Sequence, residues 1–297
     1  MVAPKQTAVR GELKHAEPMK AHTSWRVGGP ADVYFKPADR DDLVAFLAQN
    51  DVSEAALWLG LGSNLLVRDG GYRGLVIATH RALAGLERLE PNVVWAEAGV
   101  PCAKLARRCA NWGVGPAEFF AGIPGTVGGA LAMNAGAFDG ETWRFVREVE
   151  TVDATGRIRT RPADDFEVGY RSVHLPHHEW FMAATFEFDE VEGDGGRAIR
   201  ELLLKRKTSQ PIGQPSCGSV FRNPPGDHAA RLIEAAGLKG LQVGGAQVSS
   251  LHANFIVNTG TASAADIEAL LVLVQTVVAQ RFDVTLVPEV KIVGEFQ

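Results

Sequence analysis

The chain has 297 residues, of which 46% are hydrophobic and 22% are charged, so it is long enough to build two or three hydrophobic cores. Its 30 basic and 35 acidic residues give a net charge of −5 without a dominant run of like charge, which argues against a general nucleic-acid-binding protein. The N-terminal segment is polar, and the most apolar stretch, residues 269–279, is interrupted by Gln275. We therefore expect neither a signal peptide nor a membrane span.

The cysteines indicate the redox environment. Cys102, Cys109 and Cys217 cannot all pair with one another, and none belongs to a CxxC motif. This usage favours a reducing, cytoplasmic compartment. Cys102 and Cys109 share one face of a predicted helix and are expected to pack in a core. Cys217 has no neighbouring histidine or helix N-terminus to lower the pKa of its thiol, so we expect it to be an unreactive loop residue.

In the first half of the chain, apolar residues at alternating or helical spacing predict the elements that follow a polar leader. In chain order they are a strand at residues 31–36, a helix at 37–49, strands at 56–59, 75–78 and 93–98, and a helix at 101–112. Two glycine-rich segments, residues 60–64 and 121–136, lie among these elements.

In the second half, the same spacing predicts strands at 149–152, 158–160 and 183–188, helices at 198–207 and 228–236, a strand at 254–257 and a helix after Ser263. Residues 153–156 (DATG) are typical of a hairpin turn between the first two strands. Ser263 and Asp266 form a capping box at the start of the last helix. This order of elements predicts an α+β architecture in two or three lobes.

The glycine-rich segments are candidate ligand loops, because a residue without a Cβ lets a ligand approach the backbone closely. The first segment has only two glycines and lies between two strands, so it is not a Rossmann dinucleotide fingerprint; the chain also has no P-loop motif. Each segment alone is equally typical of a tight turn. Together, with Ser63, Asn64 and Asn134 as polar donors, they favour binding of an extended anion such as a pyrophosphate.

Three further residues are candidates for a chemical role. Ser219 lies in no G-x-S-x-G motif and has no histidine close by, so it is either a plain loop hydroxyl or a proton donor to a carbanion. Arg171 can hold a carboxylate with two hydrogen bonds, and Glu289, between Pro288 and Val290, can have a raised pKa and stay protonated. A structural role as surface charges remains the alternative for both.

A cluster of histidines superficially suggests a metal site. His174, His177 and His178 are close in sequence, but Pro176 breaks any helical register between them. We therefore expect no metal site.

Five segments of the sequence, taken in their order along the chain, resemble those of one known enzyme family. They are GLGSNLLVRDGG at residues 60–71, AGIPGTVGGALAMNAGAF at 121–138, GYRSV at 169–173, PSCGSVFRNP at 215–224 and LVPEVKIVG at 286–294. Together they resemble the UDP-N-acetylenolpyruvoylglucosamine reductases, flavoenzymes that make UDP-N-acetylmuramate for peptidoglycan. The resemblance extends from about Thr23 to Phe296.

The resemblance implies an FAD-binding fold of the vanillyl-alcohol-oxidase (PCMH) type. It implies two FAD-binding lobes, residues 1–80 and 81–205, and an α+β substrate-binding domain, residues 206–297, whose last strand returns to the active site. It also implies that FAD is bound by the two glycine-rich segments, through Gly60, Gly62, Ser63, Asn64, Leu65, Gly122, Ile123, Pro124, Gly125, Val127, Gly128, Gly129, Asn134 and Gly136.

The same resemblance implies roles in catalysis. Hydride passes from NADPH through FAD to the enolpyruvyl group of the substrate, Ser219 donates the proton, and Arg171 and Glu289 stabilise the enolate-like intermediate. Tyr170, Lys207 and Asn223 help to position the sugar nucleotide or NADPH, and the basic residues around Lys207, with Arg222, are expected to hold the substrate diphosphate. His252 and Asn254 lie in a segment, SLHANFIVN, that also resembles the family.

The interval between Arg171 and Ser219 resembles the shorter class of these enzymes, which lacks the loop whose tyrosine covers the substrate. A flavin-linked oxidase of the same fold and a non-catalytic nucleotide-binding homologue are the alternatives, and the serine and C-terminal glutamate motifs disfavour both. The partners expected are a UDP-sugar and NADPH, with no nucleic acid and no membrane. The chain is expected to be a monomer or a weak homo-oligomer in the cytoplasm.

Overall fold

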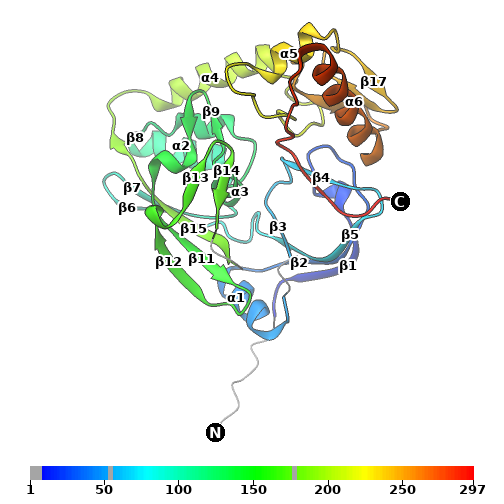
Figure 1. Ribbon diagram of the computed structural model, residues 1–297. Helices are drawn as coiled ribbons and strands as arrows, with labels where there is room; N and C mark the ends of the chain where they lie inside the picture. The colour runs from blue at the N-terminus through cyan, green and yellow to red at the C-terminus, as the bar shows by residue number, and fades with distance from the viewer. Residues whose placement is uncertain (1–8, 53–55, 176–178) are drawn as a thin grey trace. The chain divides into compact units, whose positions relative to one another are not determined.

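The computed structural model describes residues 9–52, 56–175 and 179–297 (Figure 1). The chain forms two compact units, each built from three separate stretches of sequence. Unit 1 contains the residues through His15, Val33–Gly60 and Gly74–Leu203, and unit 2 contains Ala16–Asp32, Leu61–Arg73 and Leu204–Gln297. The division into segments 1–80, 81–205 and 206–297 by ligand-binding role stays a prediction.

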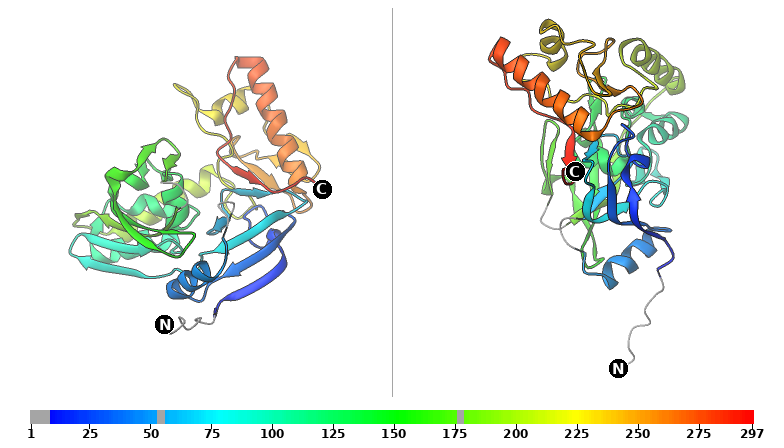
Figure 2. Two further views of the ribbon diagram at one scale, coloured as in Figure 1. Left: turned by 60° about the horizontal axis from the view of Figure 1, so that its bottom comes forward. Right: turned by 90° about the vertical axis from the view of Figure 1, so that its right-hand side faces the viewer.

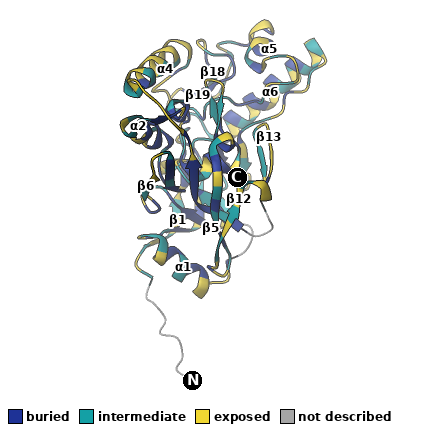
Figure 3. Cartoon of the chain, turned by 90° about the vertical axis from the view of Figure 1, so that its left-hand side faces the viewer, coloured by how far each residue is buried: buried dark blue, intermediate teal, exposed yellow. Residues whose placement is uncertain are grey.

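The largest sheet of unit 1 has five antiparallel strands. In spatial order they are β12 (Ile158–Pro162), β11 (Val146–Asp153), β15 (Glu179–Glu187), β7 (Val93–Glu97) and β6 (Leu86–Glu90). The main core of the unit joins buried side chains of β7, β11 and β15 to those of α2 (Cys102–Trp112) and α3 (Val127–Ala132). α4 (Gly195–Ser209) buries Ile199 and is otherwise half-buried or exposed, as Figure 3 shows.

A second sheet has four strands, and the division between the units falls within three of them. Their order is β1 (Glu12–Pro18), β2 (Pro30–Lys36), β5 (Tyr72–Ala78) and β3 (Leu57–Leu59), with β3 and β5 parallel. α1 (Arg40–Gln49) begins after Asp39, whose carboxylate accepts a hydrogen bond from the Asp42 N–H at 3.0 Å. Phe35, Phe46 and Ile77 pack in the smaller core of unit 1.

Short elements complete unit 1. The paired strands are β8 (Val114–Gly115) with β16 (Asp189–Glu190), β9 (Gly136–Ala137) with β10 (Gly140–Glu141), and β13 (Glu167–Gly169) with β14 (Ser172–His174). Single turns of 3₁₀ helix lie at Glu118–Gly122, Thr142–Phe145 and Ala163–Asp165 in this unit and at Met19–Ala21 in unit 2.

Unit 2 is organised around the long helix α6 (Ala264–Phe282), which is seen along its length in Figure 2. Its other elements are β4 (Leu65–Val67), α5 (Ala229–Ala235), β17 (Gln242–Val243), β18 (Ala246–Val248), β19 (Ile256–Asn258) and β20 (Lys291–Val293). β17, β18 and β19 are antiparallel, whereas β4 and β20 are parallel. α6 buries Ile267, Leu271 and Val274 in a core shared with α5 and β18.

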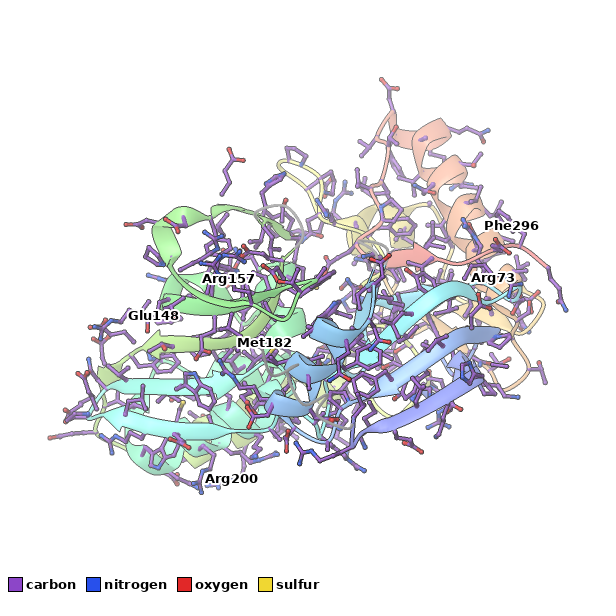
Figure 4. The ribbon with its side chains drawn as sticks, turned by 90° about the horizontal axis from the view of Figure 1, so that it is seen from below. Arg73, Glu148, Arg157, Met182, Arg200 and Phe296 are labelled. Atoms are coloured by element: carbon purple, nitrogen blue, oxygen red, sulfur yellow. The ribbon has the colours of Figure 1, made fainter. Side chains whose placement is uncertain are left out.

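Arg68 and Asp69, the two residues that follow β4, hold the start of α6 and the C-terminal segment in place. Asp69 accepts hydrogen bonds from the N–H groups of Ala264 and Ala265 at 3.0 and 2.9 Å, a favourable place for a negative charge. Arg68 donates two hydrogen bonds to Glu268, at 2.9 and 2.8 Å, and its guanidinium carbon lies 4.2 Å from the centroid of the Phe296 ring. Figure 4 labels Phe296 together with Arg73, which donates to Glu295 at 3.0 Å.

Most predicted elements are confirmed. The DATG hairpin pairs β11 with β12, the Ser263–Asp266 capping box forms, and Cys102 and Cys109 are buried on one face of α2. The first glycine-rich segment lies between strands β3 and β4, as expected. Several elements were missed, most of them strands of two or three residues; the longer ones are β1 in the polar leader, whose residues are mostly exposed, β6, and α3 in the second glycine-rich segment. β1 and β6 lack the apolar alternation on which a strand prediction depends, and α3 has only six residues, two of them glycine, which favours a loop over a helix.

A buried ion pair joins the strands of the five-stranded sheet. The side chain of Glu179 is 5% exposed and accepts hydrogen bonds from Arg161 at 2.8 and 2.7 Å, from Arg159 at 3.2 Å and from the Thr151 hydroxyl at 2.6 Å. The hydrogen bonds from Arg161 and Thr151 lower the pKa of Glu179 and outweigh the opposing effect of burial. The carboxylate is therefore stabilised in its charged form.

We expect Glu179→Gln to destabilise the protein at pH 7 by about 1–3 kcal/mol, because it breaks a buried ion pair. A pKa that is lower in the folded state means that the stabilisation is present above the ordinary pKa of 4.5 and is lost as the pH falls through the folded value. The difference between parent and variant should therefore shrink below about pH 4. Urea unfolding at both pH values measures it, with the exposed Glu187→Gln as control; equal stability of Glu179→Gln and parent at pH 7 would contradict the expectation.

Candidate active site

Arg171 lies in a two-residue turn of unit 1. The turn joins β13 to β14, in which Gly169 pairs with Ser172 and leaves Tyr170 and Arg171 between them. Arg171 has a φ of 53°, in the left-handed region that costs a residue with a side chain roughly 1–2 kcal/mol. Such strain persists where the surrounding structure holds it and is enriched at functional turns.

Two backbone carbonyls hold the Arg171 guanidinium. Its Nη1 donates a hydrogen bond to the carbonyl oxygen of Asn134 and its Nη2 to that of Gly136, both at 3.1 Å. Because carbonyl oxygens are neutral, they orient the guanidinium without cancelling its positive charge. The structure thus brings together the second glycine-rich segment and the GYRSV motif.

Thr126 belongs to the second glycine-rich segment and lies close to Gly60 of the first, within unit 1. A Cβ on Gly60 would lie 2.4 Å from Thr126 Oγ1, and the nearest atom to a Cβ on Gly129, again Thr126 Oγ1, is 3.8 Å away. Thr126 is 2% exposed, and its hydroxyl has no hydrogen-bond partner among the described residues. Since an unpartnered buried hydroxyl is costly, this arrangement fits a ligand with acceptor oxygens, such as the pyrophosphate of FAD.

The remaining residues of the second glycine-rich segment follow one another around α3. Gly122 ends a 3₁₀ helix, residues 123–125 connect it to α3, and residues 127–129 form the first turn of α3. Asn134 and Gly136 follow the end of the helix. These predicted FAD contacts therefore follow one another along the chain within unit 1, with Thr126 among them.

The later residues of the first glycine-rich segment belong to unit 2. Gly62 has a φ of 60°, and a Cβ there would lie 2.1 Å from the carbonyl oxygen of His22. The Ser24 N–H donates to the Gly62 carbonyl at 3.0 Å. This glycine therefore allows two protein backbones to approach each other, which is sufficient to explain its place in the sequence.

The Ser219 loop is fixed by Asn254 in unit 2. The Asn254 side chain accepts a hydrogen bond from the Phe221 N–H at 3.0 Å and donates one to the Phe221 carbonyl at 2.8 Å. The Val220 N–H donates to the Asn254 carbonyl at 2.9 Å. Asn254 is 4% exposed. Its amide bonds to the backbone N–H and carbonyl of Phe221 as a neighbouring strand would, and so holds the residues that follow Ser219.

The C-terminal segment holds Glu289 beside the same loop. The Glu289 N–H donates to the Val220 carbonyl at 2.8 Å, and the Arg222 N–H donates to the Val287 carbonyl at 2.9 Å. Asn64 Nδ2 donates to the Glu289 carbonyl at 3.1 Å. Three motifs far apart in sequence, around Asn64, Ser219 and Glu289, thus meet in unit 2.

The other predicted site residues have varied surroundings. Tyr170 is 49% exposed, with its ring centroid 5.2 Å from the Arg171 guanidinium carbon. Lys207 is exposed near the end of α4. The Asn223 side chain accepts a hydrogen bond from the Ala229 N–H at 3.1 Å, at the start of α5. Arg222 is half-buried, and its buried Nε has no hydrogen-bond partner among the described residues.

Burial shifts the pKa values of two side chains close in sequence to Asn254 and Ser219 in unit 2. Burial lowers the pKa of His252, whose Nδ1 accepts a hydrogen bond from the Asn254 N–H at 3.3 Å. Burial raises the pKa of the Cys217 thiol well above its ordinary value, and the charge of Glu289 adds to the effect. A thiol held protonated in this way agrees with the expectation that Cys217 is unreactive.

The described part of the chain contains no group of three or more His, Cys, Asp or Glu side chains able to hold a metal ion. His177 and His178, two of the three histidines considered above, lie outside the described residues. Across residues 9–52, 56–175 and 179–297, no helix is both long and apolar enough to cross a membrane.

Thr126 is the functional candidate that the sequence reasoning missed. A signal was present, because Thr126 is the single hydroxyl residue in residues 121–136. Its importance depends on burial and on the closeness of Gly60, neither of which can be inferred from the spacing of glycines.

We expect Thr126→Val to weaken FAD binding about tenfold, since it removes one buried hydrogen bond worth about 1–1.5 kcal/mol, whereas Thr126→Ser should bind FAD like the parent. The measurement is titration of the apoprotein with FAD, followed by flavin fluorescence. Thr79→Val is the matched control, because the buried Thr79 hydroxyl donates to the Leu59 carbonyl within the protein. Unchanged affinity in Thr126→Val would show that its hydroxyl does not contact FAD.

Comparison with known proteins agrees with these features. A family model described as "FAD binding domain" matches residues 31–161, and one described as "UDP-N-acetylenolpyruvoylglucosamine reductase, C-terminal domain" matches residues 210–293. Together the two matches cover the residues that build the glycine-rich segments, the serine loop and the C-terminal glutamate segment.

Whole-chain relatives carry the same name. The UDP-N-acetylenolpyruvoylglucosamine reductase of Alkalilimnicola ehrlichii is 59% identical over 298 residues, covering 100% of both chains, and that of Methylococcus capsulatus is 58% identical over 97% of this chain and 95% of the relative. The crystal structure of the Thermus caldophilus UDP-N-acetylenolpyruvylglucosamine reductase has a TM-score of 0.79 and 33% identity, covering 95% of this chain and 98% of that one. This chain therefore belongs to the UDP-N-acetylenolpyruvoylglucosamine reductase family of peptidoglycan synthesis, and it is an oxidoreductase with an FAD-binding domain.

Proposed function

We propose that this chain uses NADPH to reduce the enolpyruvyl group of UDP-N-acetylglucosamine enolpyruvate to UDP-N-acetylmuramate, with Arg171, Ser219 and Glu289 as its catalytic residues. The hydrogen bond from the Glu289 N–H to the Val220 carbonyl supports this most directly, because it keeps Glu289 next to the residue that follows Ser219. A proton donor and a carboxyl group held on neighbouring backbone segments suit a reaction that creates and then protonates a carbanion.

FAD, when bound, supplies the hydride transfer from NADPH to the terminal carbon of the enolpyruvyl group. The neighbouring carbon then takes a proton, and the Ser219 hydroxyl is the proposed donor. The Arg171 guanidinium stabilises the negative charge that develops on the substrate carboxylate during this step. Glu289, in its protonated form, donates a hydrogen bond to the same charge without adding a negative charge of its own.

FAD binding is assigned to the residues expected from the sequence in the two glycine-rich segments, except Asn134, whose side chain bonds fully within the protein, and with Thr126 added. The buried, unpartnered Thr126 hydroxyl supports the assignment, because it lies against Gly60 of the first segment and belongs to the second. The pyrophosphate of FAD offers acceptor oxygens for this hydroxyl and for neighbouring backbone N–H groups.

Recognition of the UDP diphosphate is assigned to Arg222 and to the basic end of α4 at Lys207. Arg222 is suited to this role, since its buried Nε lacks a hydrogen-bond partner within the described residues and a phosphate oxygen can accept from it. Tyr170, Asn223 and His252 are proposed to position the nucleotide sugar or NADPH. Asn254 is proposed to act on the substrate through the Ser219 loop, because both polar atoms of its amide are bonded to Phe221.

We place the reaction in the cytoplasm, where a reducing environment suits the three free, buried cysteines. The oligomeric state, a monomer or a weak homo-oligomer, stays a prediction.

Ser219→Ala should separate the two half-reactions. It removes one hydroxyl, so FAD content and the rate of flavin reduction by NADPH should stay close to those of the parent. The half-reaction that consumes the enolpyruvyl substrate needs the proton and should slow by about 10²- to 10⁴-fold, as is typical for loss of a general acid. Anaerobic rapid mixing with absorbance at the flavin band measures both steps.

Ser216→Ala is the control for this experiment, because it makes the same change in the same loop outside the proposed site. If Ser219→Ala consumes the enolpyruvyl substrate at the parent rate, the proton comes from water or from another side chain, and the assignment of Ser219 is wrong.

For Glu289, the informative comparison is between Gln and Ala. Glu289→Gln retains a hydrogen-bond donor of nearly the same shape, so it should retain at least about tenfold more activity than Glu289→Ala. Turnover with NADPH and the enolpyruvyl substrate, at matched FAD content, measures the difference. An equal loss in both variants would indicate that Glu289 acts through its charge or its ability to transfer a proton.

A further inference from the structure

We propose that Asn134 is a positioning residue for Arg171: through its amide and its carbonyl it holds the Tyr170–Arg171 turn and fixes the direction of the guanidinium. This inference rests on the proposed catalytic role of Arg171 and assigns Asn134 a function other than the contact with FAD expected from the sequence. All the contacts involved lie within unit 1.

Every polar atom of the Asn134 side chain bonds within the protein. Nδ2 donates to the Gly169 carbonyl and to Glu141 Oε2, both at 3.2 Å, and Oδ1 accepts from the Trp143 N–H at 3.1 Å. Asn134 is 3% exposed. Its amide therefore has both donor hydrogens and its acceptor oxygen engaged with protein groups.

Asn134 contacts the Arg171 turn from two directions. Its side chain bonds to the carbonyl of Gly169, the residue that enters the turn, and its own carbonyl accepts a hydrogen bond from Arg171 Nη1 at 3.1 Å. One residue thus binds both the backbone of the turn and the functional group of its second residue. A shift of the turn would break both contacts together.

The turn needs such an anchor, because β13 and β14 form a two-stranded sheet by themselves. All three residues of β13 are exposed, and an isolated hairpin of this kind is at best marginally stable. In addition, the left-handed φ of Arg171 disfavours the turn. The Asn134 contacts offset both costs at the point where the guanidinium is oriented.

The chemistry of position 134 fits asparagine in particular. Its φ is 43°, which asparagine and aspartate tolerate better than other residues with a side chain. Glycine would accept this φ but has no amide, and aspartate would accept it but cannot donate to the Gly169 carbonyl. An aspartate would also place its carboxylate against that of Glu141.

Asn134→Asp therefore tests the inference, together with the double variant Asn134→Asp/Glu141→Gln. In the double variant a glutamine amide can donate to the new carboxylate, which restores the link between positions 134 and 141 but not the bond to Gly169. We expect the double variant to recover the thermal stability that Asn134→Asp loses. The half-reaction with the enolpyruvyl substrate should nevertheless stay about 10- to 100-fold slow in both variants, as is typical for a misplaced functional group.

FAD content and flavin reduction by NADPH separate this role from a contact with the cofactor. Both should remain within about threefold of the parent in the two variants, since Arg171 acts on the substrate. Loss of FAD from Asn134→Asp and from the double variant, with the substrate step normal in the FAD-loaded fraction, would instead support the direct cofactor contact and overturn the proposal.

A double-mutant cycle with Arg171→Ala completes the test. If Asn134 acts through Arg171, adding Asn134→Asp to Arg171→Ala should cause no further loss in the substrate half-reaction. Independent, multiplicative losses would overturn the positioning role. A parent-like rate in Arg171→Ala itself would show instead that the proposed function of Arg171 is wrong, so the two failures are distinguishable. Thr142→Val, which removes a buried hydrogen bond to the Ala135 carbonyl, is the control for general loosening of this segment.

Discussion

The organisation of unit 2 depends on the way one short C-terminal segment is held on both sides by backbone hydrogen bonds. Glu289 donates through its N–H to Val220 and accepts through its carbonyl from Asn64, and the Lys291 N–H donates to the Asn64 carbonyl at 3.1 Å. The flanking Leu286 and Val290 are buried in the same core. A residue held at both its N–H and its carbonyl has little freedom to shift, so the backbone from which the Glu289 side chain projects is fixed in place.

Unit 1 orients its charged group by a different means. Arg171 lies in a turn of a small exposed hairpin, and its guanidinium is directed by carbonyl oxygens of the neighbouring glycine-rich segment. Here the backbone of the turn is strained and side-chain contacts compensate for the strain. The position of Glu289 is fixed by strand-like pairing of its backbone, whereas the position of the Arg171 guanidinium is fixed by a small number of polar contacts.

The sequence predicted the α+β class, most of the longer helices and strands, and the strand–turn–strand setting of the first glycine-rich segment, because alternating apolar residues and turn signals are local. It could not predict that Gly62 serves an approach between two protein backbones or that Thr126 is buried without a partner. Those features depend on neighbours distant in sequence. Asn254 is a further example, because its amide bonds to a residue 33 positions away. Its part in holding the serine loop therefore could not be inferred from a sequence motif.

The parallel pair of β4 and β20 has a consequence for the order of events during synthesis. The hydrogen bond between Asn64 and Glu289 joins residues 225 positions apart, and β4 pairs with β20 in the same region. Because the ribosome makes β4 long before β20, β4 stays without its parallel partner until β20 has been synthesised and has left the ribosome. Pairing over such a separation is slow to form, so nascent chains of this enzyme should carry an exposed strand, β4, that is a natural target for chaperones.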